Sequence, residues 1–442
     1  MTRQIFIGPL IHTNENEELI IKERVAVYID GGKIINVKET LPTNHDKIID
    51  FVANFCAKKD INILSPGQFM TPGFIDCHTH ANQFPNLGLG YNKPLLGWLE
   101  TYTYPLEKKF IDTKYAETVF EAVVKRTIEM GTTTACYFAS LYTKASVILA
   151  KKTVELGQRA FIGKVNMSTP RDDEYYESVQ ESIKNTQAFI ESIEQIKNPL
   201  VKPIVTPRFA LSCDMELMKK LAEIAKDKDL HIQTHISENE DEVEKVKQTF
   251  SNTYAAVYNS AGLLTRKTIL AHGIYLDDSE LALLKKKGTA VIHCPSSNTN
   301  LKSGLCDVQK LKTEGITVGL GTDVSGGASY SMLNEMRSAL QVSNSIFFMK
   351  KKEKEKYTPL NYKQVFYMAT LGGAEALSID NEVGNLTKGK QFDALIIEMD
   401  AKDNLLNNLK IFDKLKEDFQ RFIYTGDDRN IVSVYVNGNK VK

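Results

Sequence analysis

The chain has 442 residues, of which 42% are apolar and 25% charged, and this composition excludes a disordered, collagen-like or disulfide-stapled protein. Because one α/β barrel takes about 250 residues, we expect one large domain and one smaller domain. The 55 basic residues balance the 55 acidic ones, so no overall positive field exists to hold a nucleic acid or an anionic membrane. A small, neutral ligand is therefore the better expectation.

The cellular compartment is expected to be the cytoplasm. No apolar run approaches the roughly 18 residues of a membrane span, and MTRQIFIGPLIHT has no long apolar stretch followed by a cleavage site. The six cysteines are scattered without a C-x-x-C pair, which indicates reduced thiols.

Residues 1–69 are predicted to be β structure. RVAVYIDGGKIINV alternates apolar and polar positions around a turn at Gly31 and Gly32. Near the other end, FDALIIEM is a strand candidate, and IVSVYVNGNKV is a second hairpin closed at Asn437 and Gly438. We expect residues 1–69 and 386–442 to form together one small β-sandwich domain.

Residues 70–385 alternate strands with amphipathic helices, the pattern of a parallel α/β barrel. The predicted fold class is therefore α/β, with a (β/α)8 TIM-type barrel beside the small domain. The charge run KKKEKEK from Lys350 is expected to be a solvated loop. The eight strand candidates are GFIDCHTH, TTTACYF, AFIGKVNM, KPIVTPRF, HIQTHISE, TILAHGIY, TAVIHCPS and TVGLGTDV.

The catalytic groups of such a barrel lie at the C-terminal ends of its strands and in the loops that follow. Here those ends are rich in histidine, and the last candidate strand ends with a carboxylate instead. The residues concerned are His78, His80, His235, His272, His293 and Asp323.

A metal site is predicted at these strand ends. His78 and His80 are two residues apart, so on a strand they face the same side and can chelate one ion. Neutral imidazole suits Zn²⁺, and His235 with Asp323 can supply further ligands while leaving room for water. His231 shares the parity of His235 but lies about 13 Å deeper along the strand, so we interpret it as a core histidine.

Two further polar residues belong to the same edge of the barrel. His272 could be another ligand or could hydrogen-bond a metal-bound water, and ligand chemistry leaves both roles open. Glu238 lies three residues beyond His235, in the loop after the strand. A glutamate there can orient a ligand, but beside an open coordination position it is well placed to carry protons, which we favour.

Five segments at the strand ends, PGFIDCHTH, THISEN, LAHG, HCPSSN and GLGTDV, resemble in this order the amidohydrolase superfamily of metal-dependent barrel hydrolases. Within it, the chain resembles the guanine-deaminating branch over nearly its whole length. The segments that carry this closer resemblance are HANQ, PLLGWLETYTYP, TPRFALSC and GTDVSGG.

The resemblance implies hydrolytic deamination of guanine to xanthine and ammonia, a step of purine catabolism, with one zinc ion per chain and iron less favoured. It also suggests a homodimer. Glu238, His272 and Asp323 become the catalytic residues, with metal-bound hydroxide attacking C2 and Glu238 shuttling the proton. The implied metal ligands are His78, His80, His235 and Asp323.

The resemblance also implies a purine pocket. Guanine presents O6 and N7 as acceptors, which the donor fork of Arg208 can meet, whereas Gln83 offers a donor and an acceptor. Adenine carries an amino group in place of O6 and would leave Arg208 unpaired, so we expect adenine to be rejected. The implied substrate-binding residues are Gln83, Arg208, Phe209, His80, His235 and Glu238.

Other functions compete with this interpretation. A related amidohydrolase acting on an adenosine derivative, an s-triazine or cytosine would share the metal centre and differ in its pocket. A cytidine-type zinc deaminase is excluded, because H-x-E followed by P-C-x-x-C does not occur. A non-catalytic scaffold relative is disfavoured, since all four ligand candidates and Glu238 are present.

Overall fold

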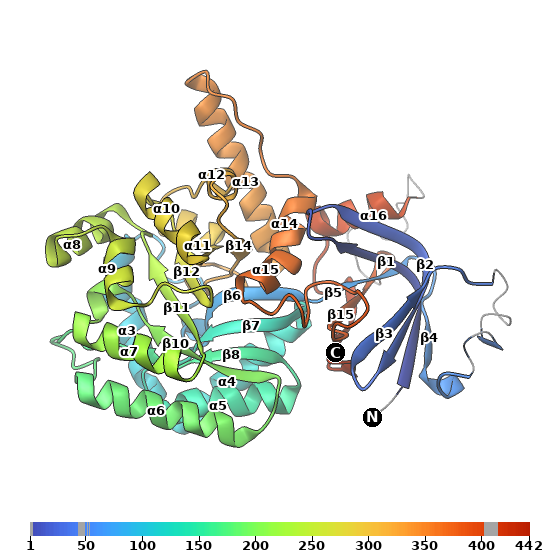
Figure 1. Cartoon of the computed structure of the whole chain (residues 1–442), viewed down its shortest axis with the longest axis horizontal. Helices are drawn as coiled ribbons and strands as arrows, with labels where there is room; N and C mark the ends of the chain where they lie inside the picture. Colours follow the sequence, from blue (N-terminus) through green and yellow to red (C-terminus); the bar gives the residue numbers. More distant parts are fainter. Residues whose placement is uncertain (1–2, 43–48, 51, 53, 402–413) are drawn as a thin grey trace.

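The computed structural model describes residues 3–42, 49–50, 52, 54–401 and 414–442 and places a barrel beside a separate mixed sheet (Figure 1). Within these ranges, eight parallel strands follow one another around the barrel in chain order, and the two-residue β9 (Val165–Asn166) adds to one of them. The predicted fold class is confirmed. The strands are β6 (Phe74–His80), β7 (Thr132–Phe138), β8 (Arg159–Gly163), β10 (Val201–Pro207), β11 (His231–Ile236), β12 (Thr268–His272), β13 (Ala290–His293) and β14 (Val318–Leu320).

The barrel closes between its first strand, β6, and the segment that follows its last strand, β14. The amide of Asp323 donates to the carbonyl oxygen of His78 at 2.8 Å, and the amide of His80 donates to that of Val324 at 3.0 Å. The closure therefore lies at the strand ends where the sequence predicts the metal site.

Helices cover the outside of the barrel. In α7, an apolar stripe is buried at Leu217, Met218 and Leu221, and α10 ends at Gly288, whose φ of 67° suits a helix C-cap. The helices of the barrel are α2 (Leu95–Trp98), α3 (Tyr104–Glu107), α4 (Thr113–Glu129), α5 (Thr143–Leu156), α6 (Val179–Ile196), α7 (Met215–Asp227), α8 (Glu240–Phe250), α9 (Tyr254–Ala261), α10 (Asp278–Lys287), α11 (Pro295–Asn300), α12 (Val308–Thr313), α13 (Met332–Lys352), α14 (Tyr362–Met368) and α15 (Leu371–Ala376).

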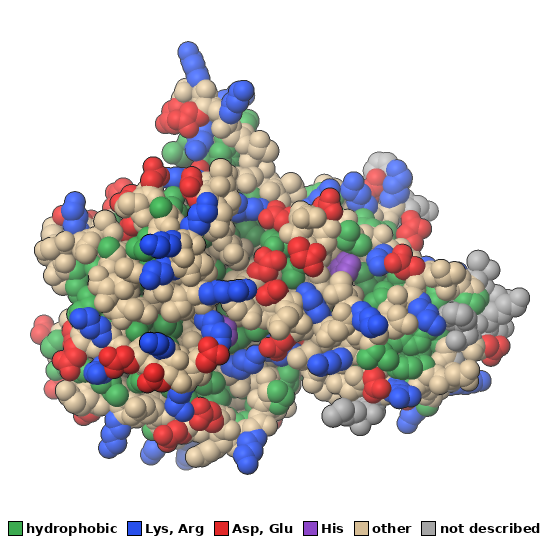
Figure 2. Space-filling view, viewed as in Figure 1, with side chains coloured by type: hydrophobic (Ala, Val, Ile, Leu, Met, Phe, Trp, Pro, Cys, Tyr) green, Lys and Arg blue, Asp and Glu red, His purple; other side chains and the backbone are tan. Residues whose placement is uncertain are grey.

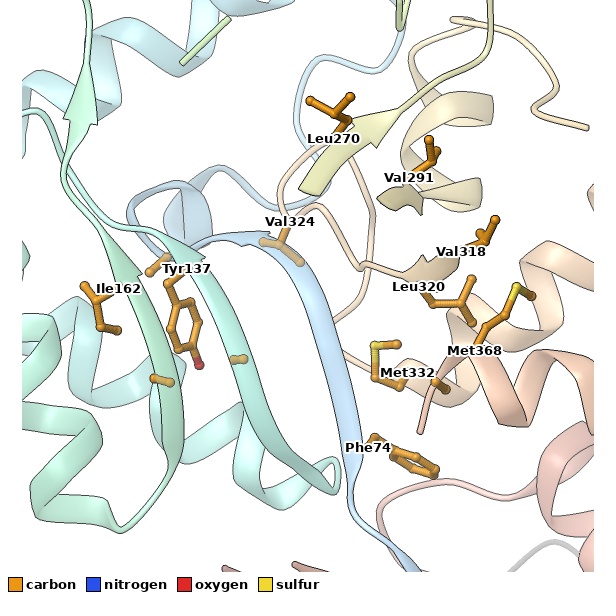
Figure 3. Close-up of a cluster of buried hydrophobic side chains, with 14 of the residues drawn as sticks. Phe74, Tyr137, Ile162, Leu270, Val291, Val318, Leu320, Val324, Met332 and Met368 are labelled. Atoms are coloured by element: carbon orange, nitrogen blue, oxygen red, sulfur yellow. The ribbon is translucent and has the colours of Figure 1, made fainter. Parts of the chain in front are cut away.

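Alternate residues of the barrel strands face two different cores. Leu270 and Val291 belong to the large cluster between strands and helices, part of which Figure 3 shows. Ile269 and Ile292, their neighbours along the chain, belong to a second cluster that also contains Ala374 of α15. Because strand side chains alternate with period two, each strand is buried on both faces, as parallel sheets require.

The strands near the two chain ends form the second sheet, in the order β17-β16-β15-β5-β1-β2-β3 with β4 beside β1. In Figure 1 the blue and red strands lie side by side. Both predicted hairpins are present, and a Cβ on Gly32 would lie 2.3 Å from Oδ1 of Asn437, so the two turns pack together. Domain boundaries at 69/70 and 385/386 stay a prediction. The elements are β1 (Arg3–Thr13), β2 (Leu19–Asp30), β3 (Lys33–Lys38), β4 (Ile61–Ile63), β5 (Gln68–Pro72), β15 (Ala394–Glu398), α16 (Leu415–Thr425), β16 (Ile431–Val436) and β17 (Asn439–Lys440).

The charge run from Lys350 is a loop only in part, because α13 continues to Lys352. Lysines in the last turn of a helix interact favourably with its C-terminal carbonyl groups, and Lys350 also pairs with Asp307 at 3.2 Å.

Basic and acidic side chains are interspersed on the face shown in Figure 2. Among the helices described, none is long and apolar enough to cross a membrane.

A buried ion pair joins the barrel to the terminal sheet. Nε and Nη2 of Arg159, at the start of β8, donate to the two carboxylate oxygens of Asp393 at 3.0 and 3.2 Å. The two residues are 3% and 4% exposed. Asp393 also accepts from the amide of Asn437 at 2.7 Å, so one carboxylate connects the barrel with the second hairpin turn.

We expect Asp393→Ala to lower the free energy of unfolding by about 3 kcal/mol, because it leaves the Arg159 guanidinium buried without its main partner. Urea unfolding followed by circular dichroism measures this as a shift of the midpoint. The control is Asp428→Ala, which removes one of the two carboxylates paired with the more exposed Arg126 and is expected to cost no more than about 1 kcal/mol. Equal shifts in the two variants would contradict the role of Asp393.

Candidate metal centre and substrate pocket

Four buried side chains converge at the C-terminal end of the barrel. His78 and His80 come from β6, His235 from β11, and Asp323 from the segment after β14. Each offers one ligand atom, and these atoms all lie within 4.8 Å of one another. Nε2 of His78 lies 3.0 Å from Oδ1 of Asp323, and Nε2 of His80 lies 3.2 Å from Nε2 of His235. The structure thus brings together the four predicted ligands.

The chemistry of this donor set fits a zinc ion. Burial lowers the pKa of His80 to about 4, and burial with the neighbouring imidazoles lowers the pKa of His235 well below its usual value, so both rings are neutral near pH 7. Nδ1 of His235 donates to the carbonyl oxygen of Arg208 at 2.5 Å, which leaves the lone pair of its ring on Nε2. This lone pair points toward Nε2 of His80, where an ion could accept it. Three imidazoles and one carboxylate are ligands that zinc takes.

The backbone at the ends of two strands is strained. His272 has a φ of 79° and Asp323 a φ of 44°, in the left-handed region that side chains with a Cβ rarely adopt. Such conformations cost about 1–3 kcal/mol each and persist where the surrounding structure holds them.

Asp76, which the sequence did not identify as a site residue, hydrogen-bonds to both of the segments that close the barrel. It is fully buried and accepts hydrogen bonds from the hydroxyl of Thr322 at 2.6 Å, the amide of Thr322 at 3.0 Å and the amide of His78 at 3.2 Å. It therefore connects the ligand His78 with Thr322, the residue before the ligand Asp323. A carboxylate inside an apolar strand is itself a signal, since aspartate is rarely buried without partners.

Glu238 and His272 lie beside the four-residue cluster. Oε2 of Glu238 is 3.3 Å from Nε2 of His272, and its Oε1 accepts from the hydroxyl of Ser303 at 3.0 Å. Burial, and next the charge of Asp323, raises the pKa of Glu238 to about 8. Nδ1 of His272 is 2.8 Å from Oδ1 of Asn298, and its Nε2 is 3.9 Å from Asp323. His272 thus lies next to the predicted ligands without being one of the four.

A pocket with an empty volume of about 420 Å³ opens onto this centre. Its polar lining includes the predicted substrate residues Gln83 and Arg208, and Phe209 contributes to its apolar wall. The sequence did not identify most of the remaining wall, which comes from the segment around α2 and from Leu301, directly after α11. The apolar lining residues are Leu95, Trp98, Leu99, Phe209 and Leu301.

The structure also brings Gln83 and Arg208 together on one buried carboxylate, that of Glu107 at the end of α3. No sequence signal identified Glu107, because a glutamate in a helix is typical of a solvated surface. His231, in contrast, behaves as predicted: its Nε2 hydrogen-bonds to the carbonyl oxygen of Leu377 at 2.8 Å, away from the centre.

Comparison with known proteins gives a consistent family assignment. The model of the amidohydrolase family matches residues 69–441. A curated guanine deaminase of Pongo abelii is 44% identical over 445 residues, covering 99% of this chain and 96% of that protein. The guanine deaminase of Dictyostelium discoideum is 42% identical, covering 99% and 98%. The crystal structure of a guanine deaminase from C. acetobutylicum with bound guanine in the active site has a TM-score of 0.90 and 35% identity, covering 100% of both chains.

We expect Asp76→Ala to weaken zinc affinity by about 10- to 100-fold, because partners that orient ligands contribute this much in metal sites. Competition with a chromogenic chelator measures the affinity. The matched control is Asp214→Ala, which removes the N-cap of α7 and should lower stability while leaving zinc affinity unchanged. Unchanged zinc affinity in Asp76→Ala would show that the ligands need no such support.

Proposed function

The chain belongs to the amidohydrolase family, and we propose that it hydrolyses guanine to xanthine and ammonia with one zinc ion held by His78, His80, His235 and Asp323. The observation that supports this most directly is the position of the cluster at the base of a pocket that also contains Gln83 and Arg208. When bound there, zinc would act as a Lewis acid that makes a water nucleophilic near neutral pH.

Glu238 is the proton carrier in this proposal. Its raised pKa of about 8 keeps the carboxyl group protonated near neutral pH, and Ser303 holds one of its oxygens. The other oxygen is left to deliver a proton to ring nitrogen N3 as water adds to C2. Glu238 then regains a proton from the attacking water and passes it to the departing amine, so that the C2–N bond breaks and ammonia leaves. The remaining hydroxyl proton of the adduct restores the protonated carboxyl group.

His272 and Asp323 orient the attacking water and take up its proton. Asn298 fixes the ring of His272 through Nδ1, which leaves Nε2 directed toward Glu238 and Asp323. Since these three groups lie together in a buried site, a proton can pass among them without reaching bulk water.

The substrate is held on the opposite side of the pocket. Arg208 donates toward O6 and N7 of guanine, Gln83 adds a hydrogen bond, and Phe209 packs against the ring. His80, His235 and Glu238 line the same pocket and complete the substrate contacts.

The proposal also includes a cytoplasmic homodimer. All six cysteines are free, which is typical of a reducing compartment. The dimer is supported by the resemblance to the guanine-deaminating branch of the family. The boundaries 1–69, 70–385 and 386–442 are part of the same proposal.

We expect Glu238→Gln to bind close to one equivalent of zinc and to lose activity by orders of magnitude, since the amide cannot carry the proton. Metal analysis of the purified wild-type and variant proteins, together with the rate of ammonia release, checks both statements. A wild-type protein with no zinc, or with two equivalents, would be incompatible with a single-zinc centre. Retained turnover would remove Glu238 from the mechanism.

The decisive experiment on the substrate is ammonia release from guanine, adenine, adenosine, cytosine and an s-triazine at equal concentrations. Guanine should be converted, whereas adenine should be slower by at least about 100-fold, because its amino group leaves buried donors unpaired. Faster turnover of adenosine, cytosine or the triazine would refute guanine as the substrate while leaving the metal centre in place.

A further inference from the structure

Glu107 is a buried carboxylate that no step of the proposed mechanism uses. It is the last residue of α3 and is 0% exposed. Its Oε1 accepts from Nε2 of Gln83 at 2.9 Å, and its Oε2 accepts from Nη1 of Arg208 at 2.6 Å and from the hydroxyl of Tyr175 at 3.0 Å. One side chain therefore contacts both Gln83 and Arg208, the two residues proposed to hydrogen-bond the purine on this side of the pocket.

The carboxyl group of Glu107 is ionised. Burial alone would raise its pKa, but the charge and the hydrogen bond of Arg208 outweigh burial and bring the pKa below its usual value. An ionised carboxylate only accepts hydrogen bonds, so each neighbour must present a donor to it. The Arg208 guanidinium also lies 5.0 Å from the ring centre of Tyr104. The face of this ring stabilises the positive charge of Arg208.

These contacts determine the orientation of the Gln83 amide. Its Nε2 faces the Glu107 carboxylate, and its Oε1 accepts from the backbone amide of Ser325 at 3.1 Å. Turning the amide by 180° would place oxygen against carboxylate and an N–H against an N–H. Gln83 therefore has one N–H left for a ligand, and Arg208 keeps further N–H groups, whereas the Gln83 oxygen is already engaged.

We propose that Glu107 is a positioning residue that makes this wall of the pocket donate hydrogen bonds, by holding both Gln83 and Arg208 as donors. The substrate class follows: fused heterocycles that present acceptors on this edge, such as 6-oxopurines, bind, and analogues with an amino group there do not. This inference rests on the proposed deamination of guanine.

The test replaces Glu107 by glutamine, which is isosteric and has one oxygen instead of two. Gln83 and Arg208 donate to different oxygens of Glu107, so in glutamine one of these positions becomes an NH2 group. If the oxygen stays with Arg208, the NH2 group faces Gln83, whose amide is released and can turn its oxygen toward the ligand. The measurements are kcat and KM for guanine, and inhibition constants for hypoxanthine and adenine. Hypoxanthine keeps the acceptor edge of guanine but has no 2-amino group, and adenine has an amino group at that edge.

For Glu107→Gln we expect KM for guanine to rise about tenfold or more with a smaller fall in kcat, since the residue does not touch the reacting atoms. The preference for hypoxanthine over adenine should fall at least about tenfold. A merely structural role would lower the amount of folded enzyme but leave this ratio of inhibition constants unchanged.

Two control variants are available. Glu100→Gln changes the same residue type in the same segment, where Glu100 is exposed and pairs with Arg171; it should leave KM and the inhibitor ratio within about twofold. Tyr175→Phe removes the third donor to Glu107 and should retain the preference for hypoxanthine. If Glu107→Gln does not fold, Glu107→Asp keeps the charge with a shorter reach, and it should raise KM while retaining the preference.

The outcomes are distinguishable. A wild-type enzyme that does not deaminate guanine would refute the proposed function itself. Normal wild-type turnover with an unchanged inhibitor ratio in folded Glu107→Gln would overturn the role of Glu107 alone. Loss of the preference in Glu107→Asp would also overturn it, because the charge that orients Gln83 would still be present.

Discussion

The hydrogen bonds that close the barrel between β6 and the segment after β14 set the distance between His78 and Asp323. The amide of Asp323 donates to the carbonyl oxygen of His78 at 2.8 Å, so the backbone itself places the two residues side by side. Asp76 reinforces the contact from below, through three donors. The left-handed φ of Asp323, 44°, is held by this network, since an isolated residue would relax to an ordinary conformation. The hydrogen bonds that close the barrel therefore also position two of the four residues of the candidate metal centre.

Two buried glutamates, Glu238 in the pocket lining and Glu107 behind Gln83 and Arg208, differ in protonation because their neighbours differ. Glu107 has a guanidinium beside it and remains ionised, whereas burial, and next the charge of Asp323, raises the pKa of Glu238 to about 8. One glutamate thus acts as an acceptor that orients Gln83 and Arg208, and the other stores a proton. The same residue type carries two kinds of chemistry a short distance apart.

The strand pattern and the histidines at strand ends are sufficient to predict the barrel, the four-residue cluster and the position of Glu238 from the sequence. Period-two alternation within short segments predicts the strands, and the known location of barrel active sites then predicts where the site residues lie. Glu107 and Trp98 could not be found in this way, because the helices between β6 and α4 are too short to show a period and their side chains are buried by long-range packing. The prediction of a loop from Lys350 was partly wrong, because a run of charged residues is also compatible with the last turn of a helix such as α13.

The terminal sheet has a consequence for the order of folding during synthesis. β5 pairs with β1, and its other edge pairs with β15, so Pro72 lies opposite Ala394. Until the ribosome has produced the last strands, β5 is an unpaired edge that carries the apolar Phe69 and Met70, both of which are buried in the finished protein. The barrel lies between the two halves in the chain, so it can form before this edge is covered. A nascent chain that stops short of β15 is therefore an aggregation hazard even with a complete catalytic barrel.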